Sequence, residues 1–259
     1  MKEKVSVIKI GGNIIANSEK LAMFIANFAK LNGKKILIHG GGKLATEISE
    51  KIGIPSKMIE GRRITDAATL DVVTMVYAGL TNKKIVTLLQ KNNCNALGFT
   101  GADANMITAC KRPVKEIDYG FVGDIKDVNK KMIRTFLEAE ISPVFCSITH
   151  NENGQLLNTN ADTIASEIAI AVSKYYEVDL YYCFEKKGVL KNINDENSLI
   201  NKMNTHSYQN FIKEGIISDG MLPKLHNCFY ALNQGVSKVC IGDEKMITNT
   251  SESFTQLSL

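Results

Sequence analysis

The sequence predicts an α/β fold in which helices cover a mainly parallel β-sheet. Its N-terminal half alternates short apolar runs with segments in which apolar residues recur every three or four positions, as in successive βαβ units. Aromatic residues make up only 7% of the chain and Trp is absent, so the core is mostly aliphatic, which suits a buried parallel sheet. With 259 residues, the chain is long enough for one large α/β unit or two lobes.

The first two βα units carry the clearest pattern. Residues 5–10 are expected to form a nearly all-apolar strand, followed by a helix that Ser18 caps. Residues 35–39 form the next strand, which leads into a helix over residues 43–52. Both strands run directly into glycines.

The remaining elements follow from the same periodicities and from turn residues. Up to residue 148 they are a hairpin or lid over 54–65, helices over 66–76 and 82–91, a glycine-rich connection at 98–103, antiparallel strands over 106–111 and 119–128, a helix over 130–140 and a strand over 143–148. A hairpin turn at Asn153-Gly154 leads to a helix over 164–172 capped by Asn160, a strand over 178–184 and a turn at 186–188. The last elements are a helix over 207–213, a helix opening at Asp219 and a strand over 238–241. We expect one domain over 1–259 whose two lobes, about 1–153 and 154–259, meet near the Asn153-Gly154 hairpin.

Composition and charge argue against several classes of function. The formal net charge of +4 is small and the basic residues are dispersed, which excludes an extended nucleic-acid surface. The six cysteines are scattered without C-x-x-C spacing, which favours free thiols in a reducing cytoplasm. We expect a cytoplasmic protein without a membrane partner, because no signal peptide and no apolar run long enough for a bilayer is recognisable.

Lys9 lies one residue before the end of the first strand. Its ammonium would be buried in low-dielectric surroundings unless an anion lies at the carboxyl end of that strand. Gly11 and Gly12 would let an anion approach the backbone N–H groups closely. A lysine that reaches solvent beside an ordinary turn is the alternative, and this strand alone leaves both open.

The second glycine turn, Gly40-Gly41-Gly42-Lys43-Leu44-Ala45, formally matches the dinucleotide-binding pattern G-x-G-x-x-A. It follows the second strand rather than the first, however, and no acidic strand end lies about 20 residues further on. The phosphate loop G-x-x-x-x-G-K-[ST] is absent, because Leu44 follows Lys43. Side by side at the carboxyl edge of a sheet, the two glycine turns would form one extended anion site.

Lys224 breaks a local rule, since a cation in the first turn of a helix opposes the helix dipole. We interpret Lys9 and Lys224 as facing one bound anion; a solvated surface lysine is the alternative for Lys224. Two lysines and glycine amides, without a catalytic His or metal cluster, favour phosphoryl transfer to an already ionised acceptor such as a carboxylate. Asp162 could hold both lysines, although the dipole of the helix that it begins also explains an acid there.

Five motifs in order carry a family resemblance: Lys9-Ile10-Gly11-Gly12, His39-Gly40-Gly41-Gly42, Gly61-Arg62-Arg63-Ile64-Thr65, Asn158-Thr159-Asn160-Ala161-Asp162 and Ser218-Asp219-Gly220-Met221-Leu222-Pro223-Lys224. Together they resemble the amino-acid kinase family over essentially the whole chain, and most closely its branch that acts on N-acetylglutamate. The resemblance implies a three-layer αβα sandwich, an N-lobe that binds the acyl amino acid and a C-lobe that binds ATP, with Mg²⁺ held through the nucleotide phosphates. It also implies phosphorylation of the side-chain carboxylate of an N-acyl-L-glutamate, acetyl or succinyl, in arginine biosynthesis.

By its matching positions, the resemblance implies a role for each site residue. Lys9 and Lys224 would stabilise the transferring phosphoryl group, and Asp162 would organise them. Arg63 would clamp the α-carboxylate of the substrate. The substrate would be held by Gly41, Gly42, Arg63 and Asn158, and the nucleotide by Gly11, Gly12, Glu185, Lys187, Gly188, Ile217 and Ser218. No side chain is assigned to a metal.

Two departures from the family pattern qualify these expectations. The Ser/Thr-Asp pair expected near the nucleotide reads Phe184-Glu185, which leaves the adenine and ribose contacts open. The chain also starts almost directly at its first strand, without the N-terminal helix of arginine-inhibited hexamers, so we expect a homodimer insensitive to arginine.

Competing hypotheses are a kinase of the same fold for carbamate, UMP, aspartate or glutamate, and a sensor of nucleotide or amino acid without catalysis. Arg63 and residues 158–162 favour the acylglutamate branch. The retained lysines and Asp162 argue against the sensor.

Overall fold

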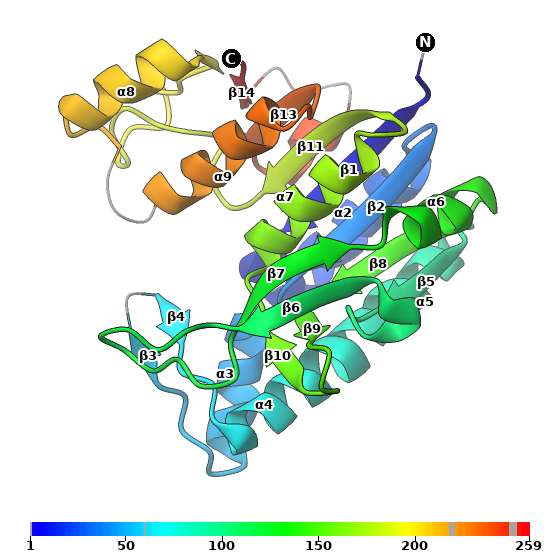
Figure 1. Cartoon of the computed structure of the whole chain (residues 1–259). Coiled ribbons are helices and arrows are strands. Elements are labelled where there is room, and N and C mark those ends of the chain that lie inside the picture. Colours follow the sequence, from blue (N-terminus) through cyan, green and yellow to red (C-terminus); the bar gives the residue numbers. More distant parts are fainter. Residues whose placement is uncertain (1, 60, 218–220, 249–252) are drawn as a thin grey trace.

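Within the described residues, a central sheet of eight strands runs through the molecule in the order β12-β14-β13-β11-β1-β2-β8-β5 (Figure 1). The computed structural model describes residues 2–59, 61–217, 221–248 and 253–259. The strands are β1 (Lys4–Ile10), β2 (Lys34–His39), β5 (Ala96–Phe99), β8 (Ser142–Cys146), β11 (Glu177–Cys183), β12 (Lys202–Met203), β13 (Lys238–Gly242) and β14 (Thr255–Leu257). From β13 to β5 all neighbours pair in parallel, and β14 is antiparallel to β13, so the predicted mainly parallel sheet is confirmed.

Helices cover both faces of this sheet, which confirms the predicted αβα sandwich. On one face, α6, α7 and α9 share a buried apolar cluster with the strands, and α2 and α5 share a second cluster on the other face (Figure 1). The helical elements are α1 (Gly12–Ala16), α2 (Ser18–Lys30), α3 (Gly42–Lys51), α4 (Ala67–Thr74), the π-helix η1 (Met75–Thr81), α5 (Asn82–Lys91), η2 (Asp103–Asn105), α6 (Lys130–Glu138), α7 (Ala161–Val172), α8 (Thr205–Lys213), α9 (Leu222–Asn233) and η3 (Glu244–Ile247).

Strand β1 explains why both faces must be covered. Val5 and Val7 pack into the cluster under α7, whereas Ile8 and Ile10 pack into the cluster under α2. Since side chains alternate along a strand, Lys9 shares the face of Val5 and Val7 and so points toward α7. The alternation of β1 therefore decides which helix faces the buried lysine.

A smaller sheet with the order β10-β9-β6-β7 and the two-stranded hairpin β3-β4 lie beside the main sheet (Figure 1). Their strands are β3 (Met58–Ile59), β4 (Arg62–Arg63), β6 (Ile107–Lys111), β7 (Gly123–Val128), β9 (Ile148–His150) and β10 (Leu156–Asn158). The antiparallel pairing of β6 with β7 confirms the prediction for this region, and the predicted turn at Asn153-Gly154 joins the antiparallel strands β9 and β10.

The structure corrects the predicted helix boundaries. Asn17 caps α2, because its side chain accepts a hydrogen bond from the backbone N–H of Lys20, whereas Ser18 already lies inside the helix. The helices predicted over 66–76 and 82–91 are one continuous run, because η1 bridges them with a π-helical segment. Asp219 lies outside the described residues.

Two strands also differ from the prediction. The strand predicted over 143–148 breaks after Cys146, and its last residue begins β9 in the smaller sheet. Gly98 and Phe99, expected in a connection, belong to β5, because they pair with Val144 and Phe145 of β8.

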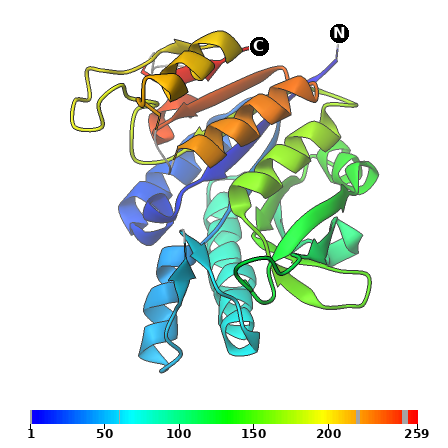
Figure 2. The same cartoon turned by 60° about the vertical axis from the view of Figure 1, so that its left-hand side comes forward.

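Figures 1 and 2 both place α8 and the strands β13 and β14 at one end of the molecule and α3 and α4 at the other. The carboxyl ends of β1 and β2 lie between these ends, where the glycine turns follow. Among the described residues, every helix is too short or too polar to cross a lipid bilayer.

Thr255 of β14 links two neighbouring backbone segments at the C-terminal edge of the main sheet through hydrogen bonds. Its hydroxyl accepts from the N–H of Val189 at 2.8 Å and donates to the carbonyl oxygen of Ile200 at 2.6 Å, and the residue is fully buried. We expect Thr255→Val to lower the free energy of unfolding by about 1–3 kcal/mol, because both backbone partners lose a buried hydrogen bond. Urea unfolding measures this change. Thr87→Val, which removes an exposed hydroxyl on α5, is the matched control, and an equal loss in both variants would contradict the prediction.

Candidate active site

Two cavities open at the carboxyl ends of the parallel strands. The larger, of about 790 Å³, lies between the first glycine turn and the segment after β11; its lining includes Lys9, Gly11, Gly12 and Lys224. The second, of about 440 Å³, is lined by the second glycine turn, the start of α7 and Lys224. Lys224 therefore lies where the two cavities meet.

An ion pair between Lys9 and Asp162 joins the two cavities. Lys9 Nζ lies 2.7 Å from Asp162 Oδ1, and each side chain is only 12% exposed. Asn160 caps α7 by accepting hydrogen bonds from the N–H groups of Asp162 and Thr163, as predicted, and so sets Asp162 in the first helical turn. Burial opposes ionisation of Asp162, but Lys9 and Lys224 outweigh it and hold the pKa of Asp162 below its ordinary value.

Lys224 reaches this pair from α9. Its ammonium lies over the ring of Phe184, with Nζ 4.3 Å from the ring centroid. Burial lowers the pKa of Lys224 below its ordinary value, although the charge of Asp162 acts in the opposite direction. Lys9, Lys224 and Asp162, which the sequence only suggests as partners, are thus neighbours in space.

Each glycine turn leads into a helix and lines its own cavity. Gly11 precedes the short helix α1, and a Cβ on Gly11 would lie 3.3 Å from the carbonyl oxygen of Cys183. Gly41 precedes α3, and a Cβ there would lie 2.8 Å from Cδ1 of Tyr77. Close packing therefore requires glycine at Gly41, and the backbone N–H groups at the start of α3 remain accessible to an anion.

Arg63 is buried beneath the second cavity, with 8% of its surface exposed. Its Nη2 donates to the carbonyl oxygen of Gly42 at 2.9 Å and to Oγ1 of Thr46 at 2.7 Å, and Nη1 contacts the hydroxyl of Ser56. Arg63 both lines the cavity and holds the glycine turn. Asn158 lines the same cavity and donates from Nδ2 to Oγ1 of Thr65 at 3.1 Å.

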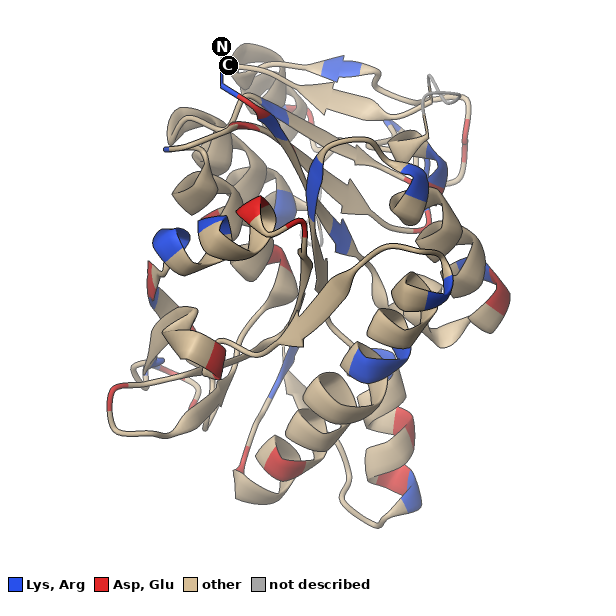
Figure 3. Cartoon of the chain, turned by 90° about the vertical axis from the view of Figure 1, so that its right-hand side faces the viewer, with Lys and Arg blue, Asp and Glu red and all other residues tan. Residues whose placement is uncertain are grey.

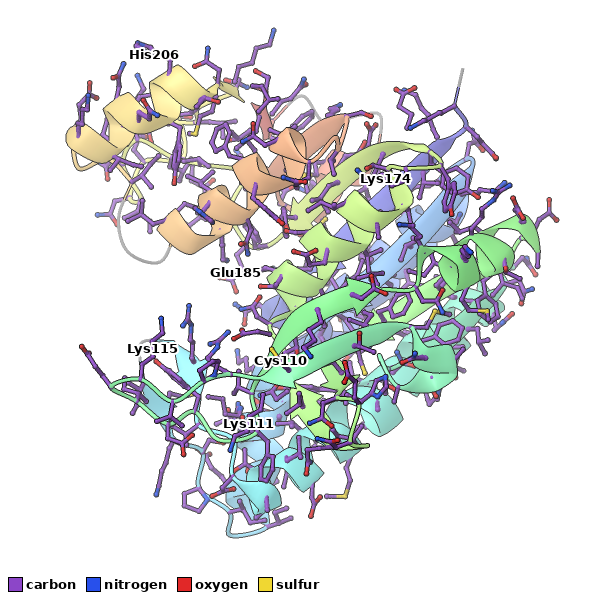
Figure 4. All side chains as sticks on the ribbon, in the orientation of Figure 1. Cys110, Lys111, Lys115, Lys174, Glu185 and His206 are labelled. Atoms are coloured by element: carbon purple, nitrogen blue, oxygen red, sulfur yellow. The ribbon has the colours of Figure 1, made fainter. Side chains whose placement is uncertain are left out.

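The residues expected at the nucleotide are only partly gathered around the larger cavity. Glu185, Gly188 and Ile217 line it, and Figure 4 shows Glu185 on the side where α9 faces the β3-β4 hairpin. Lys187 instead pairs with Glu196 at 3.7 Å, whereas Lys186 lines the cavity. Ser218 lies outside the described residues.

Comparison with known proteins assigns the chain to a family. The family described as "Amino acid kinase family" matches residues 4–243. The chain belongs to the amino acid kinase family. It is 54% identical to the acetylglutamate kinase of Cytophaga hutchinsonii, over 92% of this chain and 91% of that protein. It is 53% identical to the acetylglutamate kinase of Bacteroides fragilis, over 93% and 92% of the two chains.

A solved structure shares the fold of this chain. The crystal structure of smu.665 from Streptococcus mutans is similar with a TM-score of 0.81 and 27% identity, covering 100% of this chain and 99% of that one. The fold and the recognised family are therefore confirmed.

Tyr77 and Arg112 also line the second cavity of this amino acid kinase, and the sequence did not single them out. Arg112 follows β6 and forms an ion pair with Asp124 of β7 at 2.6 Å, a cross-strand pairing that the alternation of the two strands could have suggested. Tyr77 belongs to η1, and no local signal predicts that a π-helix turns it under Gly41.

Proposed function

We propose that the protein transfers the γ-phosphoryl group of ATP to the side-chain carboxylate of N-acetyl-L-glutamate, giving an acyl phosphate. Relatives 50–54% identical that cover more than nine-tenths of this chain are named acetylglutamate kinase, and kinases of this family use ATP. The observation that carries the proposal is the ion pair of Lys9 with Asp162, placed with Lys224 between two cavities. Its role in arginine biosynthesis belongs to the same proposal.

The proposed chemistry needs charge neutralisation rather than a base. A side-chain carboxylate with a reference pKa of about 4 is already ionised at neutral pH and can attack phosphorus directly. The obstacle is repulsion between the carboxylate and the nucleotide phosphates. One ammonium at about 4 Å offsets about 4 kcal/mol at an effective dielectric near 20, so two lysines supply a substantial share of the barrier reduction.

The residue roles follow from the two cavities. Gly11 and Gly12, with Glu185, Gly188 and Ile217, would hold ATP in the larger cavity. In the second cavity, Gly41, Gly42, Arg63 and Asn158 would hold the acylglutamate. Lys9 and Lys224 would bridge the transferring phosphoryl group, and Asp162 would keep Lys9 in place. We also propose an acceptor lobe over about 1–153 and an ATP lobe over about 154–259, although each reaches into the other's cavity: Gly11 and Gly12 line the ATP cavity, and Asn158 lines the acceptor cavity.

Magnesium would accompany the nucleotide. Among the described residues, no group of three or more His, Cys, Asp or Glu side chains could hold a metal ion, and the Asp162 carboxylate is engaged by Lys9. This donor set fits an ion that the nucleotide phosphates hold, as is usual for Mg²⁺. Bound there, it would neutralise phosphate charge.

Other hypotheses have less support. Carbamate, UMP, aspartate and glutamate kinases share the fold, but the most similar relatives reported above carry another name. A sensor would have no need for two lysines and an aspartate between its cavities. On the side shown in Figure 3, charges of both signs are intermingled over helices and loops, which offers no broad basic face to nucleic acid.

A substrate panel tests the function. We expect ATP-dependent ADP release with N-acetyl-L-glutamate, and the panel includes N-succinyl-L-glutamate to decide which acyl group is preferred. Glutamate, carbamate and UMP are the comparison acceptors. If neither N-acetyl-L-glutamate nor N-succinyl-L-glutamate gives ADP release, the assignment is refuted. Tight ATP binding without any turnover would favour the sensor.

Lys9→Ala separates catalysis from folding. We expect kcat to fall by about 10²–10³ or more, because one cation is lost from the transition state, while the protein stays folded at the assay temperature. Lys4→Ala is the matched control: Lys4 lies on the same strand, its side chain is 70% exposed, and it forms an ion pair with Glu177 at 3.3 Å. Turnover of Lys9→Ala close to that of Lys4→Ala would remove Lys9 from the mechanism.

We also propose that the protein is a homodimer. Apolar side chains are exposed along η1 and the edge strand β5, where Met75, Leu80 and Leu97 are 59%, 50% and 42% exposed. An open edge strand with apolar neighbours is a surface that a second copy can cover. Light scattering is expected to give twice the chain mass of 28.5 kDa, and Leu97→Lys should shift the protein toward the monomer. A monomeric or hexameric wild type would contradict this.

A further inference from the structure

His39 is a fully buried histidine at the end of β2, directly before the glycine turn at residues 40–42. The function proposed above gives it no task. A buried imidazole must satisfy both ring nitrogens, since each unpaired polar atom costs free energy in the interior. Its two partners therefore define what this side chain does.

The partners of His39 decide which of its ring nitrogens donates a hydrogen bond and which accepts one. His39 Nδ1 lies 2.7 Å from the carbonyl oxygen of Gly40, and a carbonyl can only accept, so Nδ1 carries the proton. Nε2 is then an acceptor, and Asn82 Nδ2 donates to it at 3.1 Å. The same Nδ2 donates to the carbonyl oxygen of Val144 at 3.0 Å, which fixes the orientation of the amide.

The ring has to be neutral for this arrangement. An imidazolium would present an N–H at Nε2 to the amide N–H of Asn82, which places two donors face to face. Burial lowers the pKa of His39 to about 4, although the hydrogen bond with Gly40 acts the other way. At neutral pH the ring is therefore neutral, and both of its hydrogen bonds, to Gly40 and to Asn82, are formed.

The fold makes room for Asn82 at this place. Asn82 is the first residue of α5, directly after η1, and is 1% exposed. Gly98 of β5 lies against Asn82, and a Cβ on residue 98 would come within 1.7 Å of Asn82 Oδ1. Glycine at this position therefore leaves the space that the Asn82 side chain occupies. The continuous segment η1-α5 therefore reaches the glycine turn in two ways. Tyr77 of η1 packs directly against Gly41, and Asn82 of α5 contacts His39, which bonds to Gly40.

We propose that His39 and Asn82 are positioning residues that fix the carbonyl of Gly40 and thereby hold the glycine turn in the geometry that binds the acceptor. This inference rests on the proposed function, in which Gly41 and Gly42 contact the acylglutamate. Asn82 acts on the glycine turn through His39, because its amide donates to Nε2 and so favours the tautomer that donates to Gly40; its hydrogen bond to Val144 orients the amide itself. ATP binds in the other cavity, so the pair should influence one substrate and not the other.

Four variants test the pair by steady-state kinetics with N-acetyl-L-glutamate and ATP. His39→Gln keeps an acceptor for Asn82 but loses the donor to Gly40, and Asn82→Ala removes the group that holds the tautomer. We expect each to raise the KM for the acceptor roughly ten-fold, with the KM for ATP within two-fold of wild type. His39→Asn keeps a donor near Nδ1 and should retain most of the affinity. Adding Asn82→Ala to His39→Asn should then change the acceptor KM little, because the imidazole through which Asn82 acts on the glycine turn is already gone.

Thr255→Val is the control for loss of stability without loss of positioning, and thermal unfolding of every variant accompanies the kinetics. Acceptor KM values at the wild-type level in His39→Gln and Asn82→Ala would overturn the proposal, as would equal rises in both KM values. If either of these two variants does not fold, the His39→Asn background decides by itself: a further ten-fold rise in acceptor KM on adding Asn82→Ala would also overturn it. A wild type that is inactive on every acylglutamate refutes the proposed function instead, which keeps the two failures distinguishable.

Discussion

The buried ion pair of Lys9 and Asp162 is the interaction on which the rest of the site depends. Each charge alone would be strongly disfavoured in these surroundings, because the desolvation of an ammonium or carboxylate costs several kcal/mol. The pair is possible only where the end of β1 meets the first turn of α7, at 2.7 Å and with 12% exposure on each side. The dipole of α7 and the cap by Asn160 favour the ionised aspartate there. This one contact therefore constrains both the register of β1 and the residue at which α7 begins.

The parallel sheet brings the anion-binding pieces to the same edge. Because β1 and β2 are adjacent and parallel, their two glycine turns follow at the same end of the sheet. Each turn begins a helix whose first N–H groups lack intrahelical partners, and each lines a different cavity. In the proposed function, one rigid sheet would thus hold two anionic substrates at fixed separation, with Lys9 and Lys224 between them. This preorganisation is what a reaction limited by charge repulsion requires.

Phe184 gives the departure from the family pattern a physical meaning. Where a Ser/Thr-Asp pair was expected, the ring of Phe184 lies under the ammonium of Lys224. An aromatic face stabilises a cation without neutralising it, so in the proposed function the charge of Lys224 would remain available to phosphate. Burial, which lowers the pKa of Lys224, opposes this charge, as do Lys9 and the dipole of α9. The charge of Asp162 and the ring of Phe184 favour it at the junction of the cavities.

The sequence by itself determined the βα units, the two glycine turns and the trio Lys9, Asp162 and Lys224, because these depend on local periodicity, turn chemistry and ordered motifs. Local patterns do not determine what distant packing decides. Lys187 was predicted at the nucleotide; in the structure it pairs with Glu196, and Lys186 lines the larger cavity. The π-helix that turns Tyr77 under Gly41 and the bond of Asn82 to His39 were decided only by the tertiary structure. They join residues 36 to 43 positions apart, so their geometry follows from how η1 and α5 pack against the sheet and not from any local pattern.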